Sequence, residues 1–90
     1  MTAFIWVAEL IISSKTEEKI VSRHRVTADE VKDAIVCVPG LPFSWNDDPE
    51  RGRRALVKVK VRNVSYLMVL YPVDAPMGDV WSLGSAYPLQ

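Results

Sequence analysis

The stretch "RALVKVKVRNVSYLMVLY" (residues 54–71) decides the fold. In its first half, valines alternate with basic residues, which is the period of two that a half-buried β-strand shows. A tight turn at Arg62 and Asn63 would set Lys60 opposite Ser65, and the apolar side chains of both strands would then share the other face. A register slipped by one residue would invert the faces. We therefore predict a hairpin with one basic face and one apolar face.

Shorter strand signals lie on both sides of this hairpin. Upstream, "LPFSW" (41–45) is typical of a proline-interrupted edge strand, and "NDDPERG" (46–52) has the acceptor side chains, proline and glycine of a loop. Downstream, "DAPMGD" (74–79) breaks the chain before a last strand, "VWSLGSAY" (80–87). We expect the C-terminal half to form an antiparallel meander of three to four strands.

The N-terminal part combines a strand with a first helix. Residues 4–12 are rich in β-branched and aromatic side chains at both odd and even positions. Because these positions point to opposite faces of a strand, the pattern predicts a strand covered on both faces. Ser14 followed three residues later by Glu17 has the spacing of a capping box. We therefore expect a helix over residues 15–24.

A second helix follows the first. Thr27 and Glu30 repeat the capping-box spacing, and the apolar residues of the next two turns fall on one helical face. The proline in "VPG" (38–40) ends this helix. The chain is thus predicted to be an α+β domain, with an N-terminal strand, two helices on one face of the sheet, and the meander.

Length and charge limit the function. Ninety residues make a single domain over residues 1–90, with one core. Eleven basic and eleven acidic side chains cancel, which argues against gripping nucleic acid by net charge. The cations are nevertheless clustered, because residues 51–62 hold six of them and no acid.

Few residues could hold a metal or a cofactor. Cys37 is the only cysteine, so an intrachain disulfide and a multi-cysteine zinc site are excluded, and a reducing cytoplasm fits. One histidine and scattered acids form no ligand set, so we expect no metal and no cofactor. The apolar run at residues 4–12 carries Glu9 and is too short to span a membrane, so no membrane partner is expected.

His24, the only histidine, lies between Arg23 and Arg25. An imidazole can act as a general acid or base, and two arginines can hold a phosphate, as cleavage of RNA through its 2′-hydroxyl requires. The competing interpretation is structural, because the position faces the core side of the helix, where the ring would bond a backbone group at the helix end. Both interpretations remain open.

Lys58 and Lys60 form a basic row on one strand face, which Tyr71 can share. Such a row can follow a nucleic-acid backbone while the aromatic ring stacks on a base. A solvated sheet face explains the lysines equally well. Arg53 and Arg54 add two further cations. Intramolecular ion pairs with the acidic residues just before them would prevent these arginines from binding a nucleic acid.

Several short motifs, spread over most of the chain, are similar to those of one family. They are Trp6, Lys19, "RHRV" (23–26) where the family often shows Lys-His-Gly-Val, "TADEV" (27–31), "GRR" (52–54) and "LMVLY" (67–71). Together they resemble the BrnT-type toxins of bacterial toxin–antitoxin pairs, whose fold is related to the RelE ribonucleases. The resemblance implies a small cytoplasmic, metal-independent endoribonuclease that arrests translation and is neutralised by a cognate antitoxin.

The resemblance also implies particular site residues. It gives His24, Arg53 and Arg54 as catalytic candidates. The residues themselves suggest the RNA contacts, which are Arg23, Arg25, Lys58, Lys60 and Tyr71. The chain departs from the family in two ways: the last strand has Ser82, then Leu83 and Gly84, where the family usually shows Ser-Ala-Arg, and its net charge is zero where such toxins are basic. Loss of that arginine removes a cation expected to stabilise transition-state charge.

Two functions are therefore predicted as alternatives. The first is a toxin-like ribonuclease that binds RNA and a cognate antitoxin, as a homodimer or as a hetero-oligomer with the antitoxin. The second is a catalytically weakened or inactive member of the same fold, which binds a protein through exposed strand edges or apolar patches around Trp45 and Trp81. The motif layout favours the first, and the departures favour the second.

Overall fold

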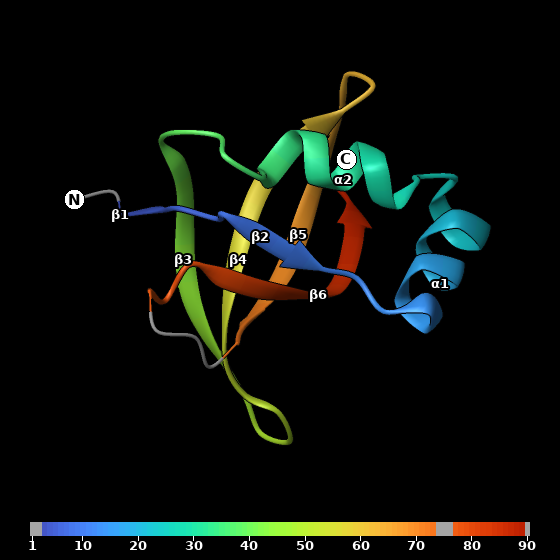
Figure 1. The fold of residues 1–90 in the computed structure, drawn as a ribbon. Coiled ribbons are helices and arrows are strands. Elements are labelled where there is room, and N and C mark those ends of the chain that lie inside the picture. Colours follow the sequence, from blue (N-terminus) through green and yellow to red (C-terminus); the bar gives the residue numbers. More distant parts are fainter. Residues whose placement is uncertain (1–2, 74–76, 90) are drawn as a thin grey trace.

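The computed structural model describes residues 3–73 and 77–89. Its elements in chain order (Figure 1) are β1 (Ala3–Ile5), β2 (Glu9–Ile11), α1 (Ser14–His24), α2 (Ala28–Ile35), β3 (Leu41–Asp48), β4 (Gly52–Val61), β5 (Val64–Pro72) and β6 (Val80–Pro88). The predicted α+β class is confirmed, with an N-terminal strand region, two helices and an antiparallel meander of β3 to β6. Within the predicted break before the last strand, residues 74–76 lie outside the described residues.

The β4–β5 hairpin has the predicted register, with Lys60 paired to Ser65. Arg62 and Asn63 have positive φ values of 53° and 65°. A two-residue turn of this kind has a twist that matches the twist of the flanking strands. The apolar face of the hairpin supplies completely buried core residues: Val57, Met68 and Leu70.

The N-terminal segment pairs with both edges of the meander. The strand order is β1-β3-β4-β5-β6-β2, with β1 antiparallel to β3 and β2 parallel to β6. Because β1 and β2 follow each other directly, the sheet curls until one stretch of chain lies along both edges. Figure 1 shows this stretch crossing in front of the sheet. Part of each edge is therefore paired within the chain, which protects it from pairing with other chains.

The prediction of one strand over residues 4–12, covered on both faces, was wrong. Strand pairing is interrupted at residues 6–8, where the Val7 carbonyl accepts from Cys37 and the Ala8 N–H donates to Asp79. One set of side chains is buried (Ile5, Val7 and Leu10), and the other is exposed (Phe4, Trp6 and Ile11). The segment changes its partner strand here, and burial changes from odd to even positions across the break.

Strand β3 is longer than predicted. Residues 46–48, expected in a loop, continue the strand and pair with β4. Residues 41–43 pair with β1 as well, so this part of β3 is not an edge strand. Cross-strand cations favour the extension, because Arg53 and Arg54 of β4 offer partners to the two aspartates at the end of β3.

The second helix has the predicted capping box, whereas the first does not. At the start of α2, the Thr27 hydroxyl accepts from the Glu30 N–H, and the Glu30 carboxylate accepts from the Thr27 N–H. At α1 the cap is Ser13, whose hydroxyl accepts from the Thr16 N–H. The capping box predicted at Ser14 was therefore wrong, although the helix itself is confirmed.

The core fills the space between the curled sheet, the N-terminal segment and the helices, with α1 packed against β6 and α2 against β4. Its largest completely buried side chains are Val7, Ile20, Val26, Val31, Ile35, Val57, Met68 and Leu70. Within the described ranges no polar or charged residue is buried. A functional site is therefore expected at the protein surface and not inside the core. Neither helix of the described chain has the length and apolar character needed to cross a membrane.

Candidate functional site

His24 is the last residue of α1 and lies against β5. Its ring stands edge-on to Tyr66, with the ring centroids 6.4 Å apart, and the side chain is half-buried. Arg25, the next residue, closes the helix in a left-handed conformation (φ 56°), with its N–H donating to the Val21 carbonyl. The imidazole is therefore neither sealed in the core nor fully exposed.

His24 also lines a cleft between α1 and β6, which we call the α1–β6 cleft. Its lining residues are Lys19, Ile20, Arg23, His24, Ser85, Ala86 and Tyr87. The enclosed part has a volume of about 20 Å³, which is enough for one water-sized group. A larger ligand would therefore sit at the mouth, where Lys19, Arg23 and Tyr87 are exposed.

The α1–β6 cleft suits an anion. Lys19, Arg23 and the imidazole line it, and no carboxylate of the described chain does. Tyr87 also lines the cleft and is 51% exposed, so this residue is open to solvent. Basic residues in the last turn of a helix also interact favourably with the helix dipole. Arg23 lies in the last turn of α1 and can thus both stabilise the end of this helix and hold an anion bound next to it.

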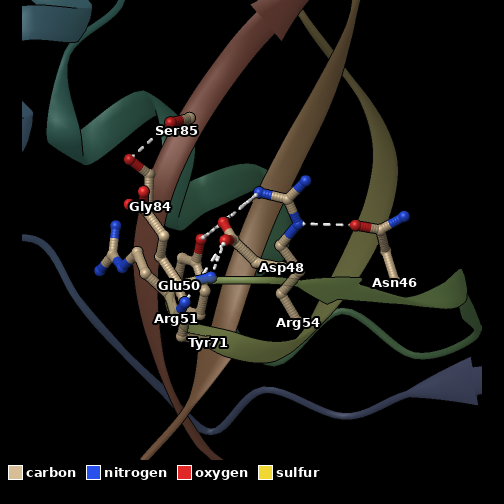
Figure 2. Close-up of polar contacts among 8 residues, drawn as sticks. All are labelled: Asn46, Asp48, Glu50, Arg51, Arg54, Tyr71, Gly84 and Ser85. Carbon is tan, nitrogen blue, oxygen red and sulfur yellow. Dashed lines mark hydrogen bonds and ion pairs between the residues drawn. The ribbon is translucent and has the colours of Figure 1, made fainter.

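Arg54 lies in a polar network on the outer face of the sheet, which is the face turned away from the core (Figure 2). Its Nε donates to Asn46 Oδ1 at 2.9 Å, and its Nη1 lies 3.2 Å from Asp48 Oδ2. The Tyr71 hydroxyl lies 3.5 Å from Arg54 Nη1 and 3.5 Å from Asp48 Oδ2. The Arg51 guanidinium covers the Tyr71 ring at 4.1 Å. Two nitrogens of the Arg54 guanidinium, Nε and Nη1, are thus bonded to side chains of the same chain.

Asp48 organises this network and the turn that follows it. Its Oδ1 accepts the backbone N–H groups of Glu50 and Arg51. The bond from Glu50 is the main reason why the pKa of Asp48 is lowered, and the Arg51 N–H and the Arg54 charge add to the effect. The pKa of Arg54 is raised, chiefly by its hydrogen bond with Tyr71 and further by attraction to Asp48. Both groups are thus held in their charged forms.

Arg53 points to the other face of β4, because neighbouring residues of a strand alternate between faces. Its Nε is 3.9 Å from Asp47 Oδ1, and its guanidinium covers the Trp45 ring at 5.1 Å. Trp45 in turn contacts Phe43 and Trp81. Arg53 therefore belongs to an aromatic cluster near the β3–β4 turn.

The structure does not bring the three predicted catalytic residues together. His24 contacts Tyr66, which pairs with Val59 of β4. Arg53 lies six residues from Val59 along the same strand, a separation of roughly 20 Å. Arg54 is turned to the outer face, away from both. The predicted group is thus divided among three places.

Among the predicted RNA contacts of the described chain, Arg23 alone lines the α1–β6 cleft with His24. Arg25 is exposed and does not line this cleft. Lys19 and Tyr87 were not predicted as site residues. Lys19 precedes Arg23 by about one helical turn, so helical spacing could have identified it. Tyr87 joins the cleft only because α1 packs against β6.

Lys58 and Lys60 line a second hollow of about 260 Å³, which we call the basic groove. Its other lining residues are Val59, Ser65 and Leu89. Tyr71 shares the outer face with the lysines, as predicted, but it lies opposite Arg54 at the other end of the strand pair. The polar network around Asp48 therefore holds Tyr71 apart from the groove.

Known proteins give no further guide to this geometry. No protein family, curated protein or solved structure compared with the chain matches it. Within residues 3–73 and 77–89, no three metal-ligating side chains gather in one place. Function is therefore inferred from the α1–β6 cleft, the basic groove and their surroundings.

Proposed function

We propose that this chain is a cytoplasmic, toxin-like ribonuclease of the BrnT and RelE kind, neutralised by a cognate antitoxin. The order of a strand, two helices and an antiparallel meander supports the resemblance. The single observation that carries the proposal is a half-buried His24 in a cleft whose other polar side chains are Lys19, Arg23, Ser85 and Tyr87. Such a cleft can bind a phosphate next to a group that moves a proton.

In this proposal cleavage runs through the 2′-hydroxyl of the RNA. The His24 imidazole accepts the 2′-hydroxyl proton, the 2′-oxygen bonds to the adjacent phosphorus, and the bond from phosphorus to the 5′-oxygen breaks. The departing 5′-oxygen takes a proton from water, which leaves a 2′,3′-cyclic phosphate and a 5′-hydroxyl. Lys19 and Arg23 hold the phosphate oxygens, whose negative charge grows in the transition state.

Arg53 and Arg54 take no part in cleavage in this proposal. Each faces a carboxylate of its own chain, Asp47 and Asp48 respectively, and neither lines the α1–β6 cleft. We assign Arg54 to holding the β3–β4 hairpin and Arg53 to the cluster around Trp45. In this proposal Lys19 and Arg23 hold the phosphate, in place of the two arginines that the family resemblance gives as catalytic candidates.

The test is expression in a bacterial host, with and without the product of the neighbouring gene, together with RNA cleavage by the purified protein. We expect growth arrest that the neighbour relieves and cleavage products with cyclic phosphate ends. His24→Gln should lower the cleavage rate by about 10²- to 10⁴-fold without unfolding the protein. Arg23→Gln should also slow cleavage.

Lys32→Gln is the matched control, because Lys32 is an exposed cation of α2 outside the cleft. It should cleave RNA at the wild-type rate. A harmless wild-type chain that leaves RNA intact contradicts the proposal. Full cleavage by His24→Gln contradicts the assigned role of the imidazole.

A protein-interaction module of the same fold is the second candidate. Trp45 favours it, because this side chain is 47% exposed and its ring lies 6.0 Å from that of the buried Trp81. An exposed tryptophan resting on a buried one offers a partner an apolar surface of fixed orientation. In that case the wild-type chain leaves growth and RNA unchanged but binds a protein partner, and Trp45→Ser weakens this binding without unfolding the chain.

A further inference from the structure

Tyr87 lies between the α1–β6 cleft and the basic groove. On the outer face of the sheet Tyr87 pairs with Leu67, and Leu67 pairs with Lys58. Two steps between neighbouring strands cover roughly 10 Å, so the two hollows are adjacent. Leu89, two residues beyond Tyr87, already lines the groove.

Positive charge extends along this path. The cleft contributes Lys19 and Arg23, and the groove contributes Lys58 and Lys60. No acidic side chain of the described residues lines either hollow. A zero net charge over the whole chain is thus compatible with two neighbouring groups of cations, and the strand register places the exposed Tyr87 of β6 beside both.

We propose that the protein binds single-stranded RNA across the edge of β6 at Tyr87, with phosphates shared between the α1–β6 cleft and the basic groove. The choice of RNA as the ligand rests on the proposed function. The exposed Tyr87 ring stacks on an unpaired base, while cations on both sides hold the backbone. A duplex keeps its bases stacked inside the helix and leaves no free base for this ring.

The two groove lysines contribute unequally to this path. Lys60 also borders a hollow that Glu30 and Asp33 of α2 line. Glu30 binds Arg62, and Asp33 adds a negative charge near Lys60. Lys58 does not border that hollow. We therefore expect Lys58 to make the stronger contact with the RNA backbone.

Fluorescence anisotropy with a labelled 2′-O-methyl oligouridine tests the path, because this strand cannot be cleaved through its 2′-oxygen. Tyr87→Leu should raise the Kd by about 5- to 150-fold, whereas Tyr87→Trp keeps a stacking ring and should bind like the wild type. Lys58→Gln should raise the Kd and reduce the slope of log Kd against log salt by about 0.7. Lys60→Gln should have a smaller effect, and the control Lys32→Gln should have none.

The possible outcomes separate the path from the ribonuclease function. Unchanged binding by Tyr87→Leu or Lys58→Gln overturns the path, whether or not the protein cleaves RNA. Equal affinity for a 2′-O-methyl duplex of the same length, or no binding of the oligouridine by the wild type, also overturns it. Binding with the expected variant pattern, but with no growth arrest and no cleavage, supports the path and refutes the ribonuclease function.

Discussion

Gly84 of β6 is the position where one added methyl group tests the outer-face packing most sharply. A Cβ at this residue would lie 2.3 Å from Cε2 and 2.9 Å from Cδ2 of the Tyr71 ring. Ordinary contacts begin near 3.4 Å, so the ring would have to retreat by about 1 Å. It has little freedom to do so, because Arg51 covers it and its hydroxyl lies beside Asp48, as Figure 2 shows.

Gly84→Ala should therefore destabilise the fold. Overpacking of this kind costs about 1–3 kcal/mol of the free energy of unfolding. For a domain of this length, such a loss lowers Tm by roughly 4–24 °C. Urea and thermal unfolding followed by far-UV circular dichroism measure the two quantities. Ser85→Ala is the control, because its hydroxyl bonds only to the adjacent Gly84 carbonyl among the described residues, and it should shift stability by less than about 0.5 kcal/mol.

A Tyr71→Ala background separates the clash from other effects of the methyl group. Without the ring, the nearest atoms that the new Cβ would meet are gone. Gly84→Ala should then be neutral or stabilising, because alanine loses less backbone entropy on folding than glycine. The double-mutant cycle should give a coupling of at least about 1 kcal/mol. Equal destabilisation in both backgrounds would refute the placement of Tyr71 over Gly84.

Three further predictions concern the hairpin turn and the cap of α2. Asn63→Gly should raise the free energy of unfolding by up to about 1 kcal/mol, because Asn63 has a positive φ that glycine adopts at less cost. A lower urea midpoint for this variant would contradict the prediction. Thr27→Ala should lower the same quantity by about 1 kcal/mol and Thr27→Ser should not, so equal losses would show that the hydroxyl cap is not the cause. The pKa of Glu30 is lowered from its ordinary 4.5, first by the bond from the Thr27 N–H and then by Arg62, so its stabilisation is present above pH 4.5 and is lost as the pH falls through the lower folded-state pKa. The free energy of unfolding should therefore fall less steeply with decreasing pH in Glu30→Gln than in the wild type. Equal pH profiles of the two proteins would contradict this.

Sequence periodicity predicted the parts of the fold that depend on neighbouring residues. The pairing of Lys60 with Ser65 and the cap formed by Thr27 and Glu30 both follow from spacing along the chain, and the structure confirms both. The interruption after Ile5 could not be predicted in this way. It arises because the N-terminal segment pairs with strands at opposite ends of the meander, and alternation of side chains does not reveal a change of partner.

The candidate site could be predicted only where its residues are close in the chain. His24 and Arg23 are sequence neighbours and line one cleft. Tyr87 joins them through the packing of α1 against β6, which no local pattern specifies. Arg54 matched a family motif, but its pairing with Asp48 depends on the extension of β3 into the predicted loop. Tertiary contacts therefore decided which cations remained available for a ligand.

The most direct measurement is a residue-resolved NMR titration of the isotopically labelled wild-type protein with 2′-O-methyl oligouridine. We predict that resonances of Arg23, His24, Tyr87 and Lys58 shift together, along one strip over the edge of β6. Shifts that gather around Trp45 instead, or no shifts at the highest strand concentration, would contradict RNA binding at the α1–β6 cleft.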